Sequence, residues 1–185
     1  LRPGDLDGTN GFVLQGAANG DGFGTSVSAA GDFNGDGIDD FLVGAPQADP
    51  STGSLTDNNG GTYVIYGQTS PFAANLSVAS LSGVDGYKIV GDAINDTSGF
   101  SVSAGGDFNG DGYDDILIGV NGAENPPSPG INFGATYVIY GSNNPSVPPE
   151  FDLTNLTTAE GVALYGVAAS DLAGSSVSSI GDFNG

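Results

Sequence analysis

The sequence predicts an all-β fold made of repeated units, and three observations carry this prediction. Glycine supplies 33 of the 185 residues without a collagen-like triplet period, so the chain needs many tight turns. No stretch keeps an apolar period of about 3.6 residues over three helical turns, which argues against long helices. The segment GDFNGDGIDDFLVG at 31–44 returns as GDFNGDGYDDILIG at 106–119, and GDFNG at 181–185 begins it again. Self-similarity at a fixed step is typical of repeat architectures.

The repeat has a period of 75 residues, the step that separates Asp32, Asp107 and Asp182. Within one period the turn-residue clusters bound four expected strands, at roughly 25–31, 39–45, 62–66 and 86–90. The first strand is small and rich in Ser, as expected where strands crowd near an axis. The second and third are compact apolar runs suited to burial on both faces, and the fourth completes the unit.

Four antiparallel strands per repeat, stacked radially with sheet packed on sheet, describe the blade of a β-propeller. Propellers close with about four to eight blades, whereas this chain holds two complete units and parts of others. We therefore expect residues 1–185 to be part of one incomplete propeller, which further repeats of the same chain would close. The expected units are about 11–85, 86–160 and a truncated 161–185.

The chain is strongly acidic. Its 22 Asp and Glu residues face only two basic residues, Arg2 and Lys88, and the formal net charge is −20. Such a surface does not bind nucleic acid or an anionic membrane, because affinity for both comes from Lys and Arg. Cations are the natural partners. An alternative is that the acidity only keeps a secreted or salt-adapted protein in solution.

Several residue types are missing from the chain. It has no Cys, His, Met or Trp. The usual ligands of zinc, copper and haem are therefore absent, as are Ser–His and Cys–His nucleophiles. No apolar run reaches about 18 residues, so no membrane insertion is expected.

Each complete repeat carries Asp-x-Asn-x-Asp-Gly-x-x-Asp between its first and second strands. Calcium prefers about six to eight oxygen ligands from carboxylates, amides, backbone carbonyls and water. In a tightly turning loop, side chains 1, 3 and 5 point inward and position 7 offers its backbone carbonyl. Gly at position 6 permits the bend, and the carboxylate at position 9 closes the cage. The predicted calcium ligands are Asp32, Asn34, Asp36, Ile38 and Asp40 in the first loop, and Asp107, Asn109, Asp111, Tyr113 and Asp115 in the second.

Two other structures share features of this loop. A plain hairpin is the first alternative, because Asp-Gly between apolar runs is a turn signal by itself. Two complete copies that keep all four oxygen-bearing side chains favour calcium over it. An EF-hand is the second alternative, but it needs a Glu at position 12, where this chain has Val43 and Ile118. Magnesium would demand a stricter octahedral geometry and fits less well.

Further polar residues lie near the loops. Asp39 and Asp114, at position 8, are interpreted as solvated strand starts beside the cage rather than ligands. The third loop supplies only Asp182 and Asn184 before the chain ends, so we do not expect it to hold an ion in this chain.

These motifs resemble the FG-GAP repeat, the unit of the integrin α-subunit propeller. The signature residues are FG at 23–24 and GAP at 44–46, on either side of GDFNGDGIDD. The second repeat departs from both, with SG at 98–99 and GVN at 119–121. The resemblance implies a seven-bladed propeller with calcium in the hairpin loops, an extracellular setting and, often, adhesion. Similar repeats also accompany phospholipase or polysaccharide-degrading domains.

A partner surface is expected at the end opposite the calcium loops. In an up-and-down blade, the loop after strand two lies opposite the loop after strand one. The loops 46–61 and 121–134 are long and irregular, which is typical of functional or disordered segments. They are predicted to bind a protein or carbohydrate, with flexible decoration as the alternative. Blade packing, rather than a ligand platform, is the expected role of Tyr63, Tyr66, Tyr137 and Tyr140.

Two functions remain open from the residues alone. The first is a calcium-binding module for adhesion or protein interaction, in which calcium rigidifies the hairpins. The alternative is a set of non-catalytic accessory or spacer repeats in a larger secreted enzyme or surface protein. Catalysis within the chain could come only from carboxylate pairs. Because the regularly spaced aspartates are assigned to calcium, no enzymatic activity is expected.

Overall fold

The computed structural model describes residues 2–50, 57–124, 130–144 and 148–179. Over these residues the chain is all-β, with short 3₁₀ turns and no α-helix. The strands are β1 (Val13–Gln15), β2 (Ser26–Gly31), β3 (Asp40–Ala45), β4 (Gly61–Ile65), β5 (Asn75–Ser77), β6 (Gly86–Val90), β7 (Ser101–Gly106), β8 (Asp115–Val120), β9 (Ala135–Ile139), β10 (Glu150–Asp152) and β11 (Gly161–Tyr165). The 3₁₀ turns are Pro3–Asp5, Val78–Ser80 and Leu153–Asn155.

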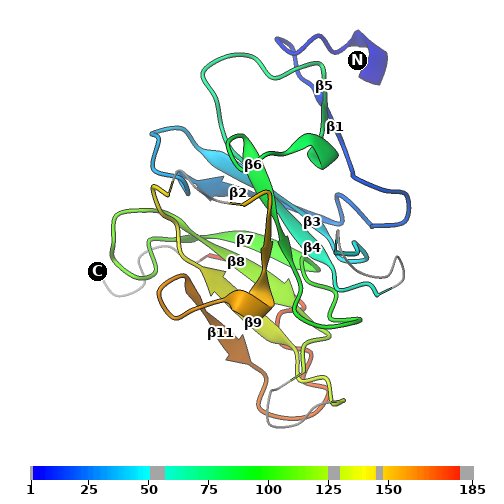
Figure 1. Cartoon of the computed structure of the whole chain (residues 1–185), viewed down its shortest axis with the longest axis vertical. Coiled ribbons are helices and arrows are strands. Elements are labelled where there is room, and N and C mark those ends of the chain that lie inside the picture. The colour runs from blue at the N-terminus through cyan, green and yellow to red at the C-terminus, as the bar shows by residue number, and fades with distance from the viewer. Residues whose placement is uncertain (1, 51–56, 125–129, 145–147, 180–185) are drawn as a thin grey trace.

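The strands form two blade-like sheets that lie side by side (Figure 1). The first sheet has the antiparallel order β6-β4-β3-β2, and the second has β11-β9-β8-β7. Each is a meander of sequential neighbours, which is the topology of a propeller blade. The four predicted strands of the repeat lie within one residue of those observed. The expectation of an all-β propeller fragment is confirmed.

Two outer strands, β1 and β6, also receive a short strand from the following repeat, which the sequence did not predict. β10 pairs in parallel with β6, and β5 pairs in the same way with β1. Both added strands have only three residues and show no alternating apolar pattern. Sequence periodicity cannot detect so short an element, because pairing with a distant strand is what makes it extended. The outer edge of the first blade is therefore covered.

The main core lies between the two sheets. Leu42, Val64 and Ile89 of the first blade belong to the same buried cluster as Ile116 and Ile118 of the second. All five side chains are fully buried. Burial of each such side chain stabilises the fold by about 1.5–3 kcal/mol. The strongly apolar second and third strands supply most of this interface, as their sequence predicts.

The two blades approach closely where Gly44 of β3 meets Gly99 of the connection before β7. Gly99 adopts a left-handed φ of +79°, and its carbonyl oxygen accepts a hydrogen bond from Ser26 Oγ at 3.0 Å. A Cβ on Gly44 would lie 2.1 Å from that carbonyl oxygen. Gly174 and Gly119 repeat the arrangement one unit later. The signature glycines therefore form a blade-to-blade contact, which survives the departures in the second repeat.

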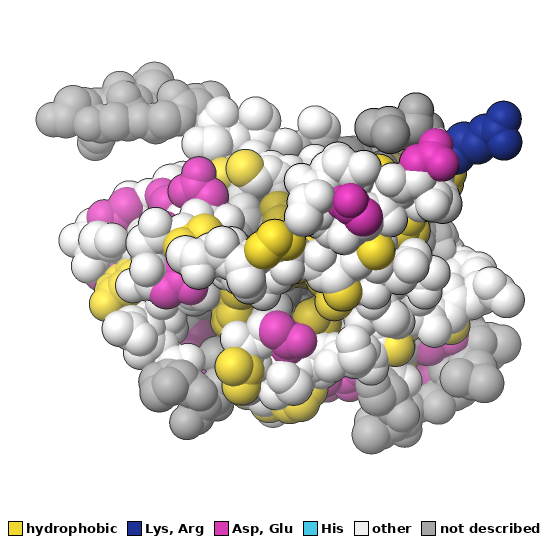
Figure 2. Space-filling model, turned by 90° about the horizontal axis from the view of Figure 1, so that it is seen from above, with side chains coloured by type: hydrophobic (Ala, Val, Ile, Leu, Met, Phe, Trp, Pro, Cys, Tyr) yellow, Lys and Arg dark blue, Asp and Glu magenta, His cyan; other side chains and the backbone are white. Residues whose placement is uncertain are grey.

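Figure 2 shows one face of the molecule, on which acidic side chains are scattered among neutral and apolar ones. On this face they do not form a single acidic patch. Across the described ranges, no helix has the length and apolar character needed to cross a membrane.

Candidate metal centre

The two Asp-rich loops lie beside each other at one end of the sheets. Each connects the first and second strands of a blade, β2 to β3 and β7 to β8. A bulge precedes each loop, with Gly31 and Gly106 at φ of +67° and +65°. Because the strands alternate in direction, the β3–β4 and β8–β9 connections leave at the opposite end. The predicted separation of the Asp-rich loops from the long loops agrees with this topology.

The first loop curls around the oxygen atoms of its own side chains. The Asp32 carboxylate accepts hydrogen bonds from the Asp36 and Gly37 amides, each at 2.9 Å. Asn34 Oδ1 also accepts from the Asp36 amide at 2.9 Å, and Asp36 Oδ1 accepts from the Ile38 amide at 2.9 Å. These bonds hold the side chains of positions 1, 3 and 5 on one side of the turn.

The second loop repeats this arrangement. The Asp107 carboxylate accepts from the amides of Asp111 and Gly112, each at 2.9 Å. Asn109 Oδ1 accepts from the Asp111 amide at 2.9 Å, and Asp111 Oδ1 accepts from the Tyr113 amide at 3.0 Å. Two loops with the same spacing thus adopt the same local structure, so the spacing itself determines the turn.

The position 9 carboxylates are buried at the base of the loops. Asp40 is 2% exposed and Asp115 is 0% exposed. Asp40 Oδ1 accepts from the Gly67 amide at 2.7 Å, and Asp115 Oδ1 accepts from the Gly141 amide at 2.9 Å. Each carboxylate therefore ties its loop to the chain that follows the third strand of the blade. The Asn34 amide donates to the other Asp40 oxygen at 3.3 Å.

The loops carry negative charge without a basic counterpart. The pKa of Asp40 is raised to about 6, mainly by burial. The negative charges of Asp36 and Asp32 also raise this pKa, whereas backbone hydrogen bonds to Asp40 lower it. Burial also raises the pKa of Asp115. The chain has two basic residues, and the one ion pair within the described residues does not involve the loops. A bound cation would supply the missing positive charge.

The donor set suits a hard cation held by mixed oxygens. Within the described ranges, no three Asp or Glu side chains gather closely enough to hold a metal by carboxylates alone. An ion would therefore also need the amide oxygens of Asn34 and Asn109 and the backbone carbonyls of Ile38 and Tyr113. Such a set matches the oxygen ligands that calcium takes, and offers none of the nitrogen or sulfur that zinc prefers.

The interpretation of the position 8 residues is wrong for one of them. Asp39 is exposed, as expected. Asp114 instead reaches the neighbouring loop, where its Oδ2 accepts from the Asp32 amide at 2.9 Å. The Tyr113 ring also covers Gly35 of the first loop. Blade-to-blade stacking creates these contacts, so one repeat considered alone gives no sign of them. Asp182 and Asn184 lie outside the described residues.

The long loops are described in part. Residues 51–56 and 125–129 lie outside the described ranges. The remaining part of the first loop lies against the second repeat, since the Asn59 carbonyl accepts from the Ser98 amide at 2.9 Å. Tyr63 and Tyr137 are each 2% exposed, which agrees with the expected packing of their rings in the blades.

Comparison with known proteins agrees with the motifs. A family model described as the FG-GAP repeat matches residues 23–65 and 98–139. Integrin alpha-4 of Xenopus laevis is 30% identical over 163 residues, covering 87% of this chain and 14% of that protein. Integrin alpha-6 of Gallus gallus is 30% identical over 132 residues, 71% of this chain and 10% of that protein. Integrin alpha-M of Mus musculus is 32% identical over 103 residues, 54% of this chain and 8% of that protein. The chain thus spans a small part of these relatives.

Proposed function

Because the chain is built from FG-GAP repeats similar to those of integrin α subunits, we propose that it is a calcium-stabilised, non-enzymatic module of an extracellular β-propeller that serves adhesion or another interaction. One observation carries the calcium assignment. The same oxygen-lined loop occurs twice, each time with a buried carboxylate at its base that no basic side chain of the described residues pairs with. A full propeller of seven blades, as the integrin likeness implies, would complete the ring.

Calcium would act on the hairpins rather than in catalysis. Asp32, Asp36 and Asp40 bring three carboxylates to one loop, whose mutual repulsion opposes the folded turn. A bound ion removes this repulsion and holds the β2–β3 hairpin. Because Asp114 joins the second loop to the first, binding in one loop stiffens its neighbour. The rim loops 46–61 and 121–134, at the opposite end, would then be presented to a partner on a rigid frame.

Thermal unfolding with calcium or with a chelator tests this role. A site with a dissociation constant near 10⁻⁴ M, in about 10⁻³ M calcium, stabilises the fold by about 1.4 kcal/mol. Two such sites contribute about 2.8 kcal/mol, which raises the melting temperature of a chain of this size by about 6–11 °C. Magnesium at the same concentration should give a smaller increase. A melting temperature that does not respond to calcium would refute the proposal.

Two matched variants separate ligation from general charge. Asp36→Asn and Asp39→Asn remove the same charge from the same loop, but only Asp36 belongs to the proposed ligand set. Calcium affinity, measured by isothermal titration, should fall about tenfold or more for Asp36→Asn and change less than about twofold for Asp39→Asn, since one lost ligand corresponds to about 1.4 kcal/mol or more. Equal losses in the two variants would mean that acidity alone attracts the ion.

A further inference from the structure

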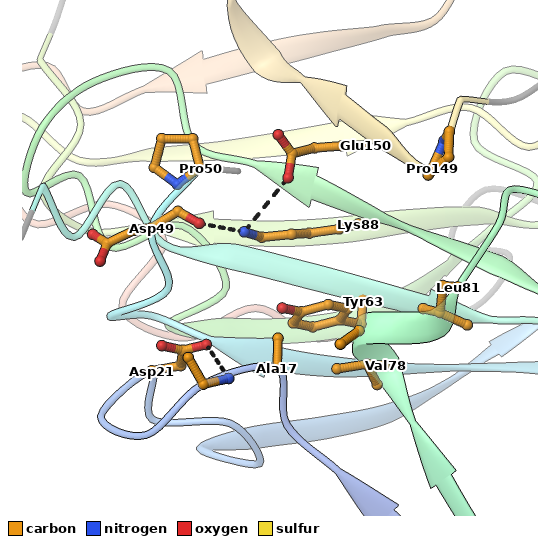
Figure 3. A pocket seen from close by; sticks show the side chains of 12 residues that line it. Ala17, Asp21, Asp49, Pro50, Tyr63, Val78, Leu81, Lys88, Pro149 and Glu150 are labelled. Carbon is orange, nitrogen blue, oxygen red and sulfur yellow. Dashed lines mark hydrogen bonds and ion pairs between the residues drawn. The ribbon is translucent and has the colours of Figure 1, made fainter. Parts of the chain in front are cut away.

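A cavity of about 320 Å³ opens on the first blade, away from the Asp-rich loops. It lies between the connection before β2, the start of the β3–β4 connection and the outer strands β6 and β10. Asp21, Tyr63, Lys88 and Glu150 line it (Figure 3). A second cavity occupies the equivalent place one repeat later, where Tyr137 takes the position of Tyr63. The molecule therefore contains the same hollow twice, and the differences between the copies are informative.

In the second cavity, side chains of the protein itself are hydrogen-bond partners of the Tyr137 hydroxyl. The Tyr137 hydroxyl donates to Asp92 Oδ2 at 3.1 Å and lies 3.4 Å from the Tyr165 hydroxyl. At the positions 75 residues earlier, the chain has Ala17 and Val90. Neither offers a polar side chain, so the first cavity lacks both partners.

Tyr63 is a buried residue in the wall of the first cavity, and its hydroxyl is placed differently from that of Tyr137. Its ring packs edge-on against Phe23 at 5.5 Å, and the residue is only 2% exposed. No hydrogen bond of its hydroxyl occurs in the described part of the chain. Because Tyr63 lines the cavity, a ligand atom placed there would give this hydroxyl a hydrogen-bond partner.

The remaining polar groups of the first cavity also differ from those of the second. Lys88 stands opposite Tyr63 in the sheet register, where the second blade has Ala163 opposite Tyr137. The Lys88 amino group donates to the Asp49 carbonyl at 2.5 Å and lies 3.7 Å from the Glu150 carboxylate. One of the two basic residues of the chain is thus held in this cavity (Figure 3).

The first cavity also holds acidic groups close to the tyrosine. Asp21 is 8% exposed, and its Oδ2 accepts from the Ala18 amide at 3.2 Å. Burial raises the pKa of Tyr63 to about 12, and the charges of Asp21 and Glu150 contribute to the shift. The cavity therefore presents an ammonium, two carboxylates and an unpaired hydroxyl around one space.

These charged and polar groups limit the class of ligand that the first cavity can bind. The Lys88 ammonium opposes a cation, and the carboxylates of Asp21 and Glu150 oppose an anion. A wholly apolar molecule would offer no hydrogen bond to the Tyr63 hydroxyl. A neutral polyol carries donors for the carboxylates and acceptors for the ammonium. Its CH groups can contact the apolar wall that includes Val78 and Leu81.

We propose that the first cavity binds a single neutral sugar ring, one hydroxyl of which completes the hydrogen bond of Tyr63. The volume lies at the small end of ligand sites, which suits one ring rather than a longer segment. The inference rests on the proposed interaction function, since Asp49 and Pro50 of the predicted partner loop line the cavity. It names a carbohydrate as the partner at that rim.

Ligand-observed NMR and isothermal titration on the full chain in saturating calcium test this site. The probes are glucose, galactose, mannose and N-acetylglucosamine, each as the monosaccharide and as its disaccharide. At least one probe should bind with a dissociation constant of about 0.1–10 mM, equivalent to roughly −3 to −5 kcal/mol. A disaccharide preference would identify a glycan chain as the source, and equal binding would identify the free sugar. No binding of any probe overturns the proposal.

Three variants locate the binding. Tyr63→Phe should weaken it about tenfold, because the sugar hydroxyl loses its partner. Ala17→Asp places a carboxylate where the second cavity has Asp92, so it should satisfy Tyr63 internally and abolish binding. Tyr137→Phe, the matched change in the other cavity, should leave binding unchanged. Binding that survives the first two changes, or falls equally in all three, contradicts the assignment.

A calcium melting curve on the same samples distinguishes the two proposals. Stabilisation by calcium without sugar binding overturns only the sugar site. Sugar binding without a calcium effect supports the site and refutes the calcium role. If Ala17→Asp fails to fold, Tyr63→Phe and Tyr137→Phe still decide the question, because each removes a single hydroxyl.

Discussion

The close approach of the blades predicts that Gly44→Ala destabilises the fold. Gly44 lies in β3, and its φ is not left-handed, so its backbone can accommodate alanine. Any loss of stability would therefore come from the contacts of the new Cβ. The new Cβ would lie 2.1 Å from the Gly99 carbonyl oxygen and 2.2 Å from Ser26 Oγ. Overpacking of this kind costs about 1–3 kcal/mol. Loss of the Ser26–Gly99 hydrogen bond adds about 0.5–1.5 kcal/mol.

A destabilisation of about 3 kcal/mol should lower the melting temperature by about 6–12 °C in calorimetry at saturating calcium. Gly119→Ala should have a similar effect, since its Cβ would lie 2.0 Å from the Gly174 carbonyl oxygen. Gly4→Ala is the control, because no atom of the described residues lies within 4 Å of the Cβ that it would add. If Gly44→Ala melted within about 2 °C of the parent chain, the blades would not be held as close as the structure has them, and the reasoning would fail.

Two further predictions concern carboxylates. Burial, with the neighbouring Asp92 carboxyl, raises the pKa of Asp96 to about 8, so the folded state keeps a proton that the unfolded state releases above about pH 4. The stability that protonated Asp96 gives the folded state is therefore lost as the pH rises from about 4 to 8. The unfolding free energy of the parent chain relative to Asp96→Asn, from urea titrations, should fall by roughly 2 kcal/mol over this window, and a flat difference would contradict the shift. With a chelator present, Asp114→Ala should lower the free energy of unfolding by about 1 kcal/mol, because the hydrogen bond to the Asp32 amide is lost. Asp39→Ala is the control and should change it by less than about 0.5 kcal/mol. Equal effects of the two variants would mean that the Asp114–Asp32 contact contributes nothing.

Local signals in the sequence determined the four main strands and the turn of the Asp-rich loops. The apolar run before Ala45 and its counterpart before Val120 are strands whichever blades surround them. The hydrogen bonds within each loop join residues at most seven apart, such as the amide of Asp36 and the carboxylate of Asp32, so the spacing alone sets them. The calcium ligand set of these loops stays a prediction that titration can test.

Only the tertiary structure decided which residues meet between repeats. Asp114 bonds to Asp32 across 82 residues, and pairing with a distant strand alone makes the three residues of β10 extended. Aligned repeats show that Ala17 replaces Asp92, but not that this position faces a tyrosine hydroxyl. Such contacts depend on how one blade stacks on the next, and a local pattern carries no information about a neighbour 75 residues away.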